Sequence, residues 1–322
     1  MSDVLLTVSD LQAGFRSRHG FVRAIDGVSF TLERGGSFGV VGESGCGKSS
    51  LSLAVMGLLP HNAEIRGGSV LYAGRDVITM GSDERRRLRG RRIAMIFQDP
   101  LTSLDPFMRV GDQVDEQIRL HLALDRTAAR RRTLDLFAAV GIPDPDQRAQ
   151  HYPHELSGGQ RQRVMIAMAL SCDPDLLIAD EPTTALDVTV QAQVLDMIRT
   201  EQRKRGMALM LITHNLGVVA GMCERVAVMY AGRFVESAPA KTLFADPRHP
   251  YTRGLFAAVP RLEGERSQTL AAIPGAPPRL STPPAGCAFA PRCAHVSDEC
   301  RAAQPPLRDH RNTILRCIKD LP

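Results

Sequence analysis

Length, composition and charge narrow the class of protein before any motif is considered. The 322 residues, 43% of them hydrophobic, can bury one large core or two modest ones, as an ordinary globular protein does. No window reaches about 18 consecutive apolar residues, and residues 1–4 lack the basic region and apolar run of a signal peptide, so we expect no membrane-spanning helix and a cytoplasmic location. The net charge of +5 is too small to select an anionic partner.

The first part of the chain alternates short strand-like runs with turn signals. Leu5 to Val8 and Val28 to Leu32 predict an antiparallel edge sheet. Residues 38–41 then predict a buried strand that leads into a glycine-rich loop, and helix-forming residues from Ser49 to Leu59 predict a helix that ends at Pro60. Strand, glycine loop and helix in this order are the context that a phosphate-binding loop requires.

The glycine loop carries residues suited to binding phosphate. Residues 42–49, Gly42-Glu43-Ser44-Gly45-Cys46-Gly47-Lys48-Ser49, fit the pattern G-x-x-x-x-G-K-S. Backbone N–H groups can converge on phosphate oxygens where side chains stay out of the way, Lys48 adds a charge near the β- and γ-phosphates, and Ser49 offers its hydroxyl to Mg²⁺. The residues that we expect to bind the nucleotide here are Gly42, Ser44, Gly45, Cys46, Gly47, Lys48, Ser49 and Ser50. A redox role for Cys46 is the alternative to a passive small side chain.

A basic and then helix-like stretch follows the loop. Residues 85–92 hold six arginines, and we interpret them as a solvated helix face because no aromatic residue interleaves them as a single-strand nucleic-acid site would require. From about residue 99 to residue 170 the chain predicts a helical subdomain inserted into the sheet domain. Its apolar positions recur at heptad-scale spacing, at Val114, Ile118 and Leu122 and again at Leu134, Phe137 and Val140.

Two further buried strands end in polar residues. Leu176 to Ala179 leads to Asp180 and Glu181, and Ala208 to Thr213 leads to His214. In a parallel α/β sheet that edge binds ligands. One carboxylate can hold Mg²⁺ while the next polarises water for in-line attack on the γ-phosphate, and the histidine can contact both the γ-phosphate and that water. Solvated loop carboxylates and a structural histidine are the alternative interpretations.

A second motif makes the interpretation of the glycine loop more specific. It is the pentapeptide Leu156-Ser157-Gly158-Gly159-Gln160. Ser157 and Gly159 offer a hydroxyl and an unhindered N–H at the start of a helix that runs to Leu170, and the positive end of that helix suits a phosphate. Together with the glycine loop, this pentapeptide resembles the ATP-binding cassette (ABC) family. The resemblance covers roughly Leu5 to Ala258 and rests on six motifs in the expected order.

The resemblance implies an α/β fold of the P-loop NTPase, ABC type: a mixed core sheet, an antiparallel edge sheet and the inserted helical subdomain at about 99–170. It implies a nucleotide-binding domain over residues 1–258 and a small Cys-rich extension over 259–322. Gln98 is similar to the glutamine of the family's Q-loop, whose side chain reaches Mg²⁺ and water. Residues Ala185-Leu186-Asp187 are similar to the family's D-loop. Ser157, Gly159 and Gln160 then bind ATP held by a second ABC ATPase subunit. Phe15 is the candidate for stacking on adenine, with an ordinary core aromatic as the alternative.

Finer resemblances indicate the branch of the family. Residues 98–106 and His249-Pro250-Tyr251-Thr252-Arg253 look like the peptide and nickel importers. The expected function is therefore an ATPase, peripheral on the cytoplasmic face of the membrane, that energises peptide uptake. The partners that this function implies are two membrane permease subunits and an extracytoplasmic solute-binding protein. Nucleic acid is not an expected partner. Nickel or another small solute is the alternative cargo, and a soluble non-transport ABC ATPase is the alternative class.

The last part of the chain changes composition. Residues 273–284 hold five prolines, which favours an extended linker, and four cysteines follow at Cys287, Cys293, Cys300 and Cys317. Their spacing contains no C-x-x-C pair, which disfavours the usual zinc ribbon, and disulfides are unfavourable in a reducing cytosol. Four thiolates match the Cys₄ demand of a 4Fe-4S cluster, which some relatives in the peptide-importer branch carry. Zinc and free thiols remain the alternatives.

Overall fold

The structure is a computed structural model that describes residues 3–18, 20–183, 186–258, 273–278, 280–282, 284–310, 312–319 and 321. Its contacts divide the chain into two units, each of which is described by itself. The helical unit comprises Met1–Asp3, Glu33–Gly36 and Thr79–Leu211. The loop unit comprises Val4–Leu32, Ser37–Ile78 and Ile212–Pro322, and it contains the glycine loop.

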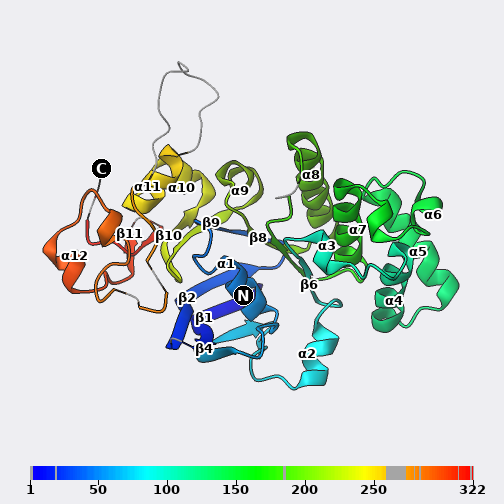
Figure 1. Ribbon diagram of the computed structural model, residues 1–322, viewed down its shortest axis with the longest axis horizontal. Helices are drawn as coiled ribbons and strands as arrows, with labels where there is room; N and C mark the ends of the chain where they lie inside the picture. Colours follow the sequence, from blue (N-terminus) through cyan, green and yellow to red (C-terminus); the bar gives the residue numbers. More distant parts are fainter. Residues whose placement is uncertain are drawn as a thin grey trace, which may run out of the picture. The chain divides into compact units, whose positions relative to one another are not determined.

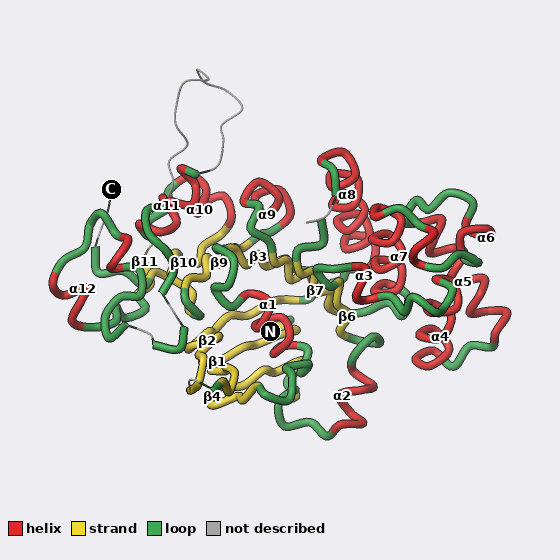
Figure 2. Tube along the Cα trace, viewed as in Figure 1, coloured by secondary structure: helices red, strands yellow, loops and turns green. Residues whose placement is uncertain are grey.

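One sheet of the loop unit is antiparallel, with strand order β2-β1-β4-β5. Figure 2 labels the first three of these strands. The strands of this sheet are β1 (Val4–Ser17), β2 (Gly20–Glu33), β4 (Ala63–Tyr72) and β5 (Arg75–Asp76). The predicted edge sheet is therefore present, but β1 and β2 are longer than the predicted runs. A bulge in β1 between Ser9 and Gln12, with Asp10 at φ 43°, lets the strand continue past its polar residues.

The other strands of the loop unit follow the order β11-β12-β10-β9-β3. β3 (Ser37–Val41) pairs in parallel with β9 (Arg225–Tyr230), which pairs in antiparallel fashion with β10 (Arg233–Pro239). β12 (Thr313–Leu315) adds to the other side of β10, and β11 (Arg308–His310) pairs with β12. β12 and β11 therefore extend the set of strands that includes the one before the glycine loop.

The first helix of this unit, α1 (Lys48–Val55), begins after Gly47 and is shorter than predicted. The chain leaves the helix at Gly57, which has φ 63° and follows the C-cap Met56, and the N–H groups of Gly57 and Leu58 donate to the carbonyls of Ala54 and Leu53. Pro60 is thus not what ends the helix. The remaining helices of the loop unit are α9 (Leu216–Met222), α10 (Ala240–Ala245), α11 (Pro250–Ala257), the 3-10 turn η2 (Ala290–Arg292) and α12 (Asp298–Ala302).

The helical unit contains the strands β6 (Ile93–Ile96), β7 (Leu176–Asp180) and β8 (Ala208–Ile212). β6 and β7 pair in parallel, and every residue of β7 and β8 is buried, as continuous apolar runs predict. Between β6 and β7 in the chain lies a group of helices in which α4, α5 and α7 pack side by side (Figure 1). The helices of this unit are α2 (Ser82–Leu88), α3 (Pro100–Ser103), α4 (Val110–Leu122), α5 (Arg126–Ala139), α6 (Pro145–Arg148), the 3-10 turn η1 (Pro153–Glu155), α7 (Gly158–Leu170) and α8 (Val188–Arg205).

The basic run at residues 85–92 begins within α2, none of whose residues is buried. This agrees with the interpretation as a solvated helix face for residues 85–88. For residues 89–92 the interpretation is wrong, because they follow the helix, and Arg91 donates to the carbonyl of Cys172. Asp83 and Glu84 in the first turn of α2 and the arginines in its last turn complement the helix dipole.

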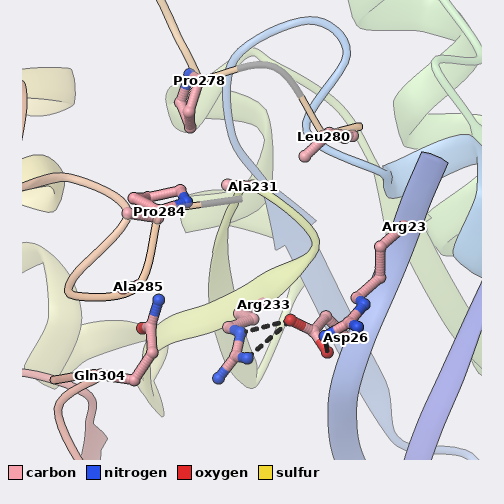
Figure 3. Close-up of a pocket in the computed structure, with 10 residues that line it drawn as sticks. Arg23, Asp26, Ala231, Arg233, Pro278, Leu280, Pro284, Ala285 and Gln304 are labelled. Carbon is pink, nitrogen blue, oxygen red and sulfur yellow. Dashed lines mark hydrogen bonds and ion pairs between the residues drawn. The ribbon is translucent and has the colours of Figure 1, made fainter. Parts of the chain in front are cut away.

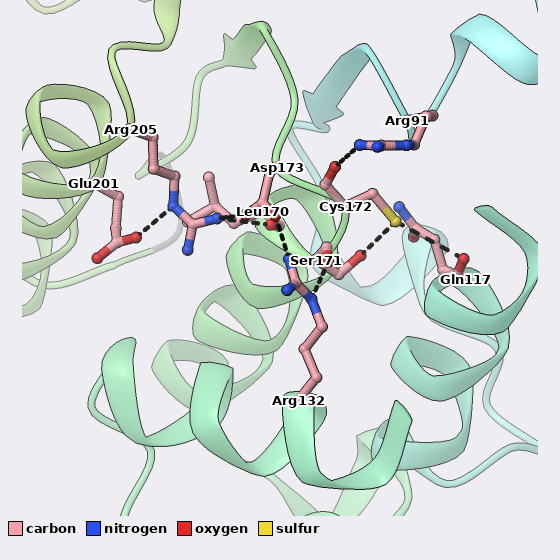
Figure 4. A network of polar contacts seen from close by, with 9 residues as sticks. All are labelled: Arg91, Gln117, Arg132, Leu170, Ser171, Cys172, Asp173, Glu201 and Arg205. Atoms are coloured by element: carbon pink, nitrogen blue, oxygen red, sulfur yellow. Dashed lines mark hydrogen bonds and ion pairs between the residues drawn. The ribbon is translucent and has the colours of Figure 1, made fainter. Parts of the chain in front are cut away.

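The C-terminal end of α7 is held by arginines from other segments (Figure 4). The carbonyls of Leu170, Ser171 and Cys172 accept hydrogen bonds from Arg205, Arg132 and Arg91, respectively. These are carbonyls that a helix end leaves without intrahelical partners. Arg132 and Arg205 also pair with the carboxylate of Asp173, which has φ 50°. One network thus joins α5, the end of α7 and α8.

The Pro-rich segment packs on the loop unit to which it belongs. The N–H of Arg23 in β2 donates to the carbonyl of Leu280 at 3.2 Å. Next to this contact lies a cavity of about 170 Å³, in which Asp26 accepts from both Arg23 and Arg233 (Figure 3). Of the expected linker, residues 279 and 283 lie outside the described part of the chain. The helices that the structure describes include none that is both long and apolar enough to cross a membrane.

Candidate functional site

The glycine loop is shaped by close backbone approaches. A Cβ atom on Gly42 would lie 2.2 Å from the carbonyl oxygen of Met229, and one on Gly47 would lie 2.2 Å from that of Ala24. Gly47 also has φ 111° and Gly45 has φ 78°, conformations that side chains disfavour. The loop therefore folds tightly against β2 and β9, and glycine is required at its two ends for steric reasons.

Lys48 is buried, with 6% of its surface exposed, and its ammonium group lies inside the loop. Nζ donates to the carbonyls of Gly42 at 2.9 Å and Glu43 at 3.0 Å. Ser49 is exposed and Ser50 is half-buried, both in the first turn of α1. This arrangement gathers a positive charge, a hydroxyl and the N-terminal N–H groups of an eight-residue helix, which together can bind phosphate.

Cys46 is a buried part of the loop, with its sulfur 3.9 Å from Nζ of Lys48. Burial raises the pKa of this thiol, while the nearby ammonium of Lys48 lowers it by less. A thiol with a raised pKa is a poor nucleophile. The structure therefore favours the passive side chain over the redox role that the sequence left open.

Tyr251 and Arg292 also contact the loop, and neither was among the residues predicted for the site. The N–H of Glu43 donates to the hydroxyl of Tyr251 at 2.8 Å, and the carboxylate of Glu43 accepts from the guanidinium of Arg292. In the sequence, Tyr251 belongs to the segment that resembles the peptide and nickel importers, which predicts no contact with the loop. Arg292 carries no motif, and it follows Glu43 by 249 residues, so nothing in the sequence pairs the two.

The predicted carboxylates lie at the end of β7 in the helical unit. Asp180 is 3% exposed, and Glu181 follows it with φ 47°, a backbone conformation that non-glycine residues seldom adopt. Such conformations concentrate at functional sites. Nε2 of Gln98 donates to Oε2 of Glu181 at 3.1 Å. The structure thus brings together the predicted Q-loop glutamine and the predicted catalytic carboxylate.

The pentapeptide forms the start of α7. The hydroxyl oxygen of Ser157 accepts from the N–H of Gln160 at 3.2 Å, and the Gln160 side chain accepts from the N–H of Ser157 at 3.0 Å, which is a capping box. Ser157 is exposed, and its hydroxyl proton stays available for donation. A Cβ on Gly159 would approach Val190 to 3.2 Å, so a larger residue would crowd this helix end.

The other predicted site residues are placed as follows. Asp187 caps α8, its carboxylate accepting from the N–H of Val190 at 2.9 Å, while Ala185 of the predicted D-loop lies outside the described residues. His214 is exposed directly after β8, and Phe15 is half-buried in β1, both in the loop unit. The roles of these residues stay predictions.

The four cysteines of the C-terminal part lie close enough to influence one another. Burial raises the pKa of Cys287, Cys293 and Cys317, and neighbouring thiols of the set add to each rise. Sulfurs of Cys293 and Cys317 each accept a backbone N–H at 3.4 Å, from His295 and Lys319. Within the described residues, however, no group of three or more His, Cys, Asp or Glu side chains is arranged to hold a metal ion.

The two cysteines outside the loop and the C-terminal set, Cys172 and Cys223, are buried. Burial raises the pKa of Cys223 to about 12. Both cysteines are therefore packing residues.

Comparison with known proteins identifies the family. The profile of the family "ABC transporter" matches residues 25–184, and that of "Oligopeptide/dipeptide transporter, C-terminal region" matches residues 235–300. The dipeptide transport ATP-binding protein DppD of Bacillus subtilis is 47% identical over 98% of this chain and 95% of its own length. The chain belongs to the ABC transporter family. The oligopeptide transport ATP-binding protein OppD of Salmonella typhimurium is 50% identical over 99% of this chain and 94% of the OppD sequence.

Solved structures support the same fold for this cassette. The ATP-binding cassette MJ0796, in a dimeric structure bound to ADP and phosphate, matches with a TM-score of 0.67 at 23% identity, over 73% of this chain and 99% of that one. The cbiO1 cassette of Clostridium perfringens matches with a TM-score of 0.64 at 27% identity, over 76% and 92%. The predicted α/β fold of the P-loop NTPase, ABC type, is confirmed, and ABC transporter ATP-binding subunits are ATPases.

Proposed function

We propose that this chain is the ATP-hydrolysing subunit of an ABC importer that takes up oligopeptides or dipeptides. The observation that carries the proposal is identity of 47% to 50% along nearly the whole chain to dipeptide and oligopeptide transport ATP-binding proteins. The match of residues 235–300 to the C-terminal region of that transporter type supports the same assignment beyond the residues that match the ABC transporter family.

The glycine loop binds the phosphates of ATP in this proposal. Its N–H groups and the N-terminal end of α1 surround the phosphate chain, and Lys48 contacts the β- and γ-phosphates. Mg²⁺ suits the oxygen donors of Ser49, Asp180 and Gln98, and when bound it neutralises charge on the phosphates. The low exposure of Asp180 supports this assignment, because a buried carboxylate favours a cationic partner.

Glu181 acts as the base. A carboxylate oxygen accepts a proton from the attacking water as the water oxygen bonds to the γ-phosphorus and the bond to the β–γ bridging oxygen breaks, which leaves ADP and phosphate. Gln98, whose side-chain amide donates a hydrogen bond to Glu181, orients that water. His214 contacts the γ-phosphate. The unusual backbone conformation of Glu181 supports a functional role for this residue.

A second ABC ATPase subunit completes each site. Ser157, Gly159 and Gln160, at the N-terminal end of the 13-residue helix α7, bind the γ-phosphate of ATP held by the partner, and Asp187 lies at the same interface. ATP binding closes the two subunits and hydrolysis reopens them. Support comes from the exposure of Ser157 and from the open space around Gly158, where the nearest atom to an added Cβ is 4.0 Å away.

The importer also requires subunits that this chain does not supply. We propose two membrane permease subunits, an extracytoplasmic solute-binding protein and a peripheral position on the cytoplasmic face of the membrane. The nucleotide-binding domain is assigned to residues 1–258, with the helical subdomain at about 99–170, and the C-terminal extension to 259–322.

For the extension we propose a 4Fe-4S cluster bound by Cys287, Cys293, Cys300 and Cys317. The mutual influence of the thiols and the backbone N–H donors to two of the sulfurs support it. Among the described residues as they lie, no group of three or more metal-binding side chains is arranged to hold an ion, so the donor set does not yet fit a cluster. Anaerobic purification should yield about four irons and four sulfides per chain with a visible absorption band, whereas stoichiometric zinc would contradict the cluster.

The cargo is tested on the reconstituted complex. ATPase activity should rise when the solute-binding protein is loaded with dipeptides or oligopeptides and should stay at its basal rate with nickel. If nickel alone stimulated ATP hydrolysis, the cargo would be nickel and not peptides. ATP hydrolysis without any dependence on permease subunits would favour a soluble non-transport ATPase.

A further inference from the structure

Glu43, the second residue of the glycine loop, is tied into the loop through its backbone. Its N–H donates to Tyr251, and its carbonyl accepts from Nζ of Lys48 at 3.0 Å and from the N–H of Cys46 at 3.3 Å. Lys48 occupies the position of the lysine that contacts phosphate in P-loop proteins, and its ammonium group is held in part by the backbone of Glu43. Any displacement of the Glu43 backbone therefore moves a carbonyl that accepts a hydrogen bond from Lys48.

The carboxylate of Glu43 is held by a residue from the far end of the chain. Arg292 donates from one guanidinium nitrogen to Oε2 at 2.6 Å and from the other to Oε1 at 2.9 Å. This is the bidentate geometry that fixes both the position and the orientation of a carboxylate. The Arg292 side chain is 4% exposed and that of Glu43 is 27% exposed, so the pair is largely shielded from water.

Arg292 is itself rigidly supported. Nε donates to the carbonyl of Pro274 at 2.8 Å, and the guanidinium lies 5.9 Å from the ring centres of both Tyr230 and Phe289. Those two rings pack edge to face at 5.4 Å and each contacts the ring of Tyr251. The hydrogen bonds with Glu43 raise the pKa of Arg292, so the guanidinium stays charged. The same aromatic cluster thus holds Tyr251 and Arg292, which contact Glu43 from outside the glycine loop.

Charge gives this contact a consequence for nucleotide binding. ATP brings several negative charges to the loop, and an unbalanced carboxylate on the second loop residue would repel them at short range, where screening is weak. The guanidinium of Arg292 cancels that charge and holds the carboxylate in one place.

We propose that Arg292 is a positioning residue for ATP binding, which neutralises Glu43 and fixes the glycine loop from the cysteine-bearing segment of the chain. Arg292 lies in η2, directly before Cys293, and the N–H of Cys287 donates to the carbonyl of Cys300 at 2.7 Å within the same segment. The conformation of this segment is thereby linked to affinity for ATP. This role of Arg292 requires that the glycine loop binds ATP, and it is the same for any cargo.

The test compares variants of the full chain by the Kd for MgADP, by kcat and KM for ATP hydrolysis, and by the thermal midpoint without nucleotide. Arg292→Gln should raise the Kd and KM about tenfold, the size of coupling expected for a shielded charge pair, with a smaller change in kcat. Adding Glu43→Gln to that variant should bring the Kd back to within about threefold of the original, because the unbalanced charge is then gone.

Arg316→Gln is the matched control. Arg316 belongs to the same C-terminal part and donates to the carbonyls of Phe234 and Pro305, away from the loop. Its replacement should leave the Kd unchanged even if the thermal midpoint falls. If Arg292→Gln does not fold, Arg292→Lys and Arg316→Lys carry the same comparison, with about a threefold rise in Kd expected for Arg292→Lys alone.

Three results would overturn the proposal. One is an unchanged Kd on replacement of Arg292. Another is an equal rise in Kd on replacement of Arg316, which would assign the effect to general loosening of the C-terminal part. The third is a double variant with Glu43→Gln that binds MgADP as weakly as Arg292→Gln alone.

Discussion

The side-chain amide of Gln98 donates to Oε2 of Glu181 at 3.1 Å, which joins the segment after β6 to the residue that follows β7. The contact follows from the sheet, because β6 and β7 are parallel and Ile96 lies opposite Ala179. Side chains that follow two such strands meet at the same edge. An exposed glutamine and a carboxylate in an unusual backbone conformation are thereby brought into direct contact.

Replacing the carboxylate tests its role as base. Glu181→Gln keeps an acceptor oxygen for Gln98 but removes the proton acceptor, so kcat should fall at least about 100-fold while the Kd for ATP changes little. Rapid-quench hydrolysis and equilibrium ATP binding measure the two quantities. Glu116→Gln, at an exposed position of α4, is the control and should match the unmodified chain. Near-normal hydrolysis by Glu181→Gln would remove Glu181 from the role of base.

The steric demand at the glycine loop gives a second prediction. Gly47→Ala places a methyl group 2.2 Å from the carbonyl oxygen of Ala24 at a φ of 111°, so the loop must move. We expect a loss of more than about 2 kcal/mol in the free energy of unfolding and loss of MgADP binding. Gly81→Ala, where an added Cβ meets nothing within 4 Å, should change stability by less than about 0.5 kcal/mol. Equal effects of the two substitutions would contradict this reading of the loop.

Asp173 provides a third test, in the helical unit. Asp173→Asn keeps a residue that tolerates a φ of 50° but removes both ion pairs, with Arg132 and Arg205. The carboxylate is 55% exposed, so the loss should be only about 1 kcal/mol and should shrink in high salt.

Two further variants separate charge from backbone conformation at this position. Asp173→Ala should cost more than Asp173→Asn, because alanine also disfavours the left-handed conformation. Asp83→Asn, which removes an exposed pair with Arg86, is the control and should have almost no effect. Denaturant titration measures all three. A salt-independent loss for Asp173→Asn would show that charge is not its cause.

His249 predicts how stability depends on pH. Burial lowers its pKa from 6.5 to about 3, so the folded protein keeps the imidazole neutral where the unfolded chain binds a proton. The unfolded state therefore gains protons as the pH falls below 6.5, and this histidine alone should cost about 1.4 kcal/mol of stability per pH unit down to about 3.

The matched variant is His249→Asn, whose amide oxygen can replace Nδ1 as acceptor for the N–H of Tyr251 at the start of α11. Its stability should depend less steeply on pH between 6.5 and 4. Glu236 accepts the N–H of His249, and burial raises the pKa of that carboxyl, which gives an opposite slope in both proteins. The difference between the two unfolding curves isolates the histidine, and parallel curves would contradict its assignment.

The sequence predicted the parts of the site that depend on local patterns. The strand, loop and helix around residues 38–55 were found because glycine, lysine and serine occur at fixed spacing with a mechanical reason for each. The strand tips at Asp180 and His214 followed from apolar runs that end in polar residues. The end of α1 was misplaced because Pro60 is the more conspicuous signal, whereas Gly57 ends the helix through its positive φ.

The contacts made by Glu43 could not be predicted. They require Tyr251 in α11 and Arg292 in η2 to meet the loop, and such meetings depend on how α11 and the Pro-rich segment pack around Tyr230 and Phe289. No periodicity records that packing. The conformation of Glu181 is likewise invisible in the sequence, because glutamate rarely adopts a positive φ and only the surrounding structure imposes it.

The position of β12 has a practical consequence for engineering the chain. β12 pairs with Glu236 and Ser237 of β10, and the N–H of Arg316 donates to the carbonyl of Val235 at 2.8 Å. A truncation made after residue 258, to obtain the ATP-binding part alone, would uncover this side of β10 and leave its backbone groups open to pairing with strands of other molecules. The shortened protein would then be prone to aggregation for a reason unrelated to its nucleotide site.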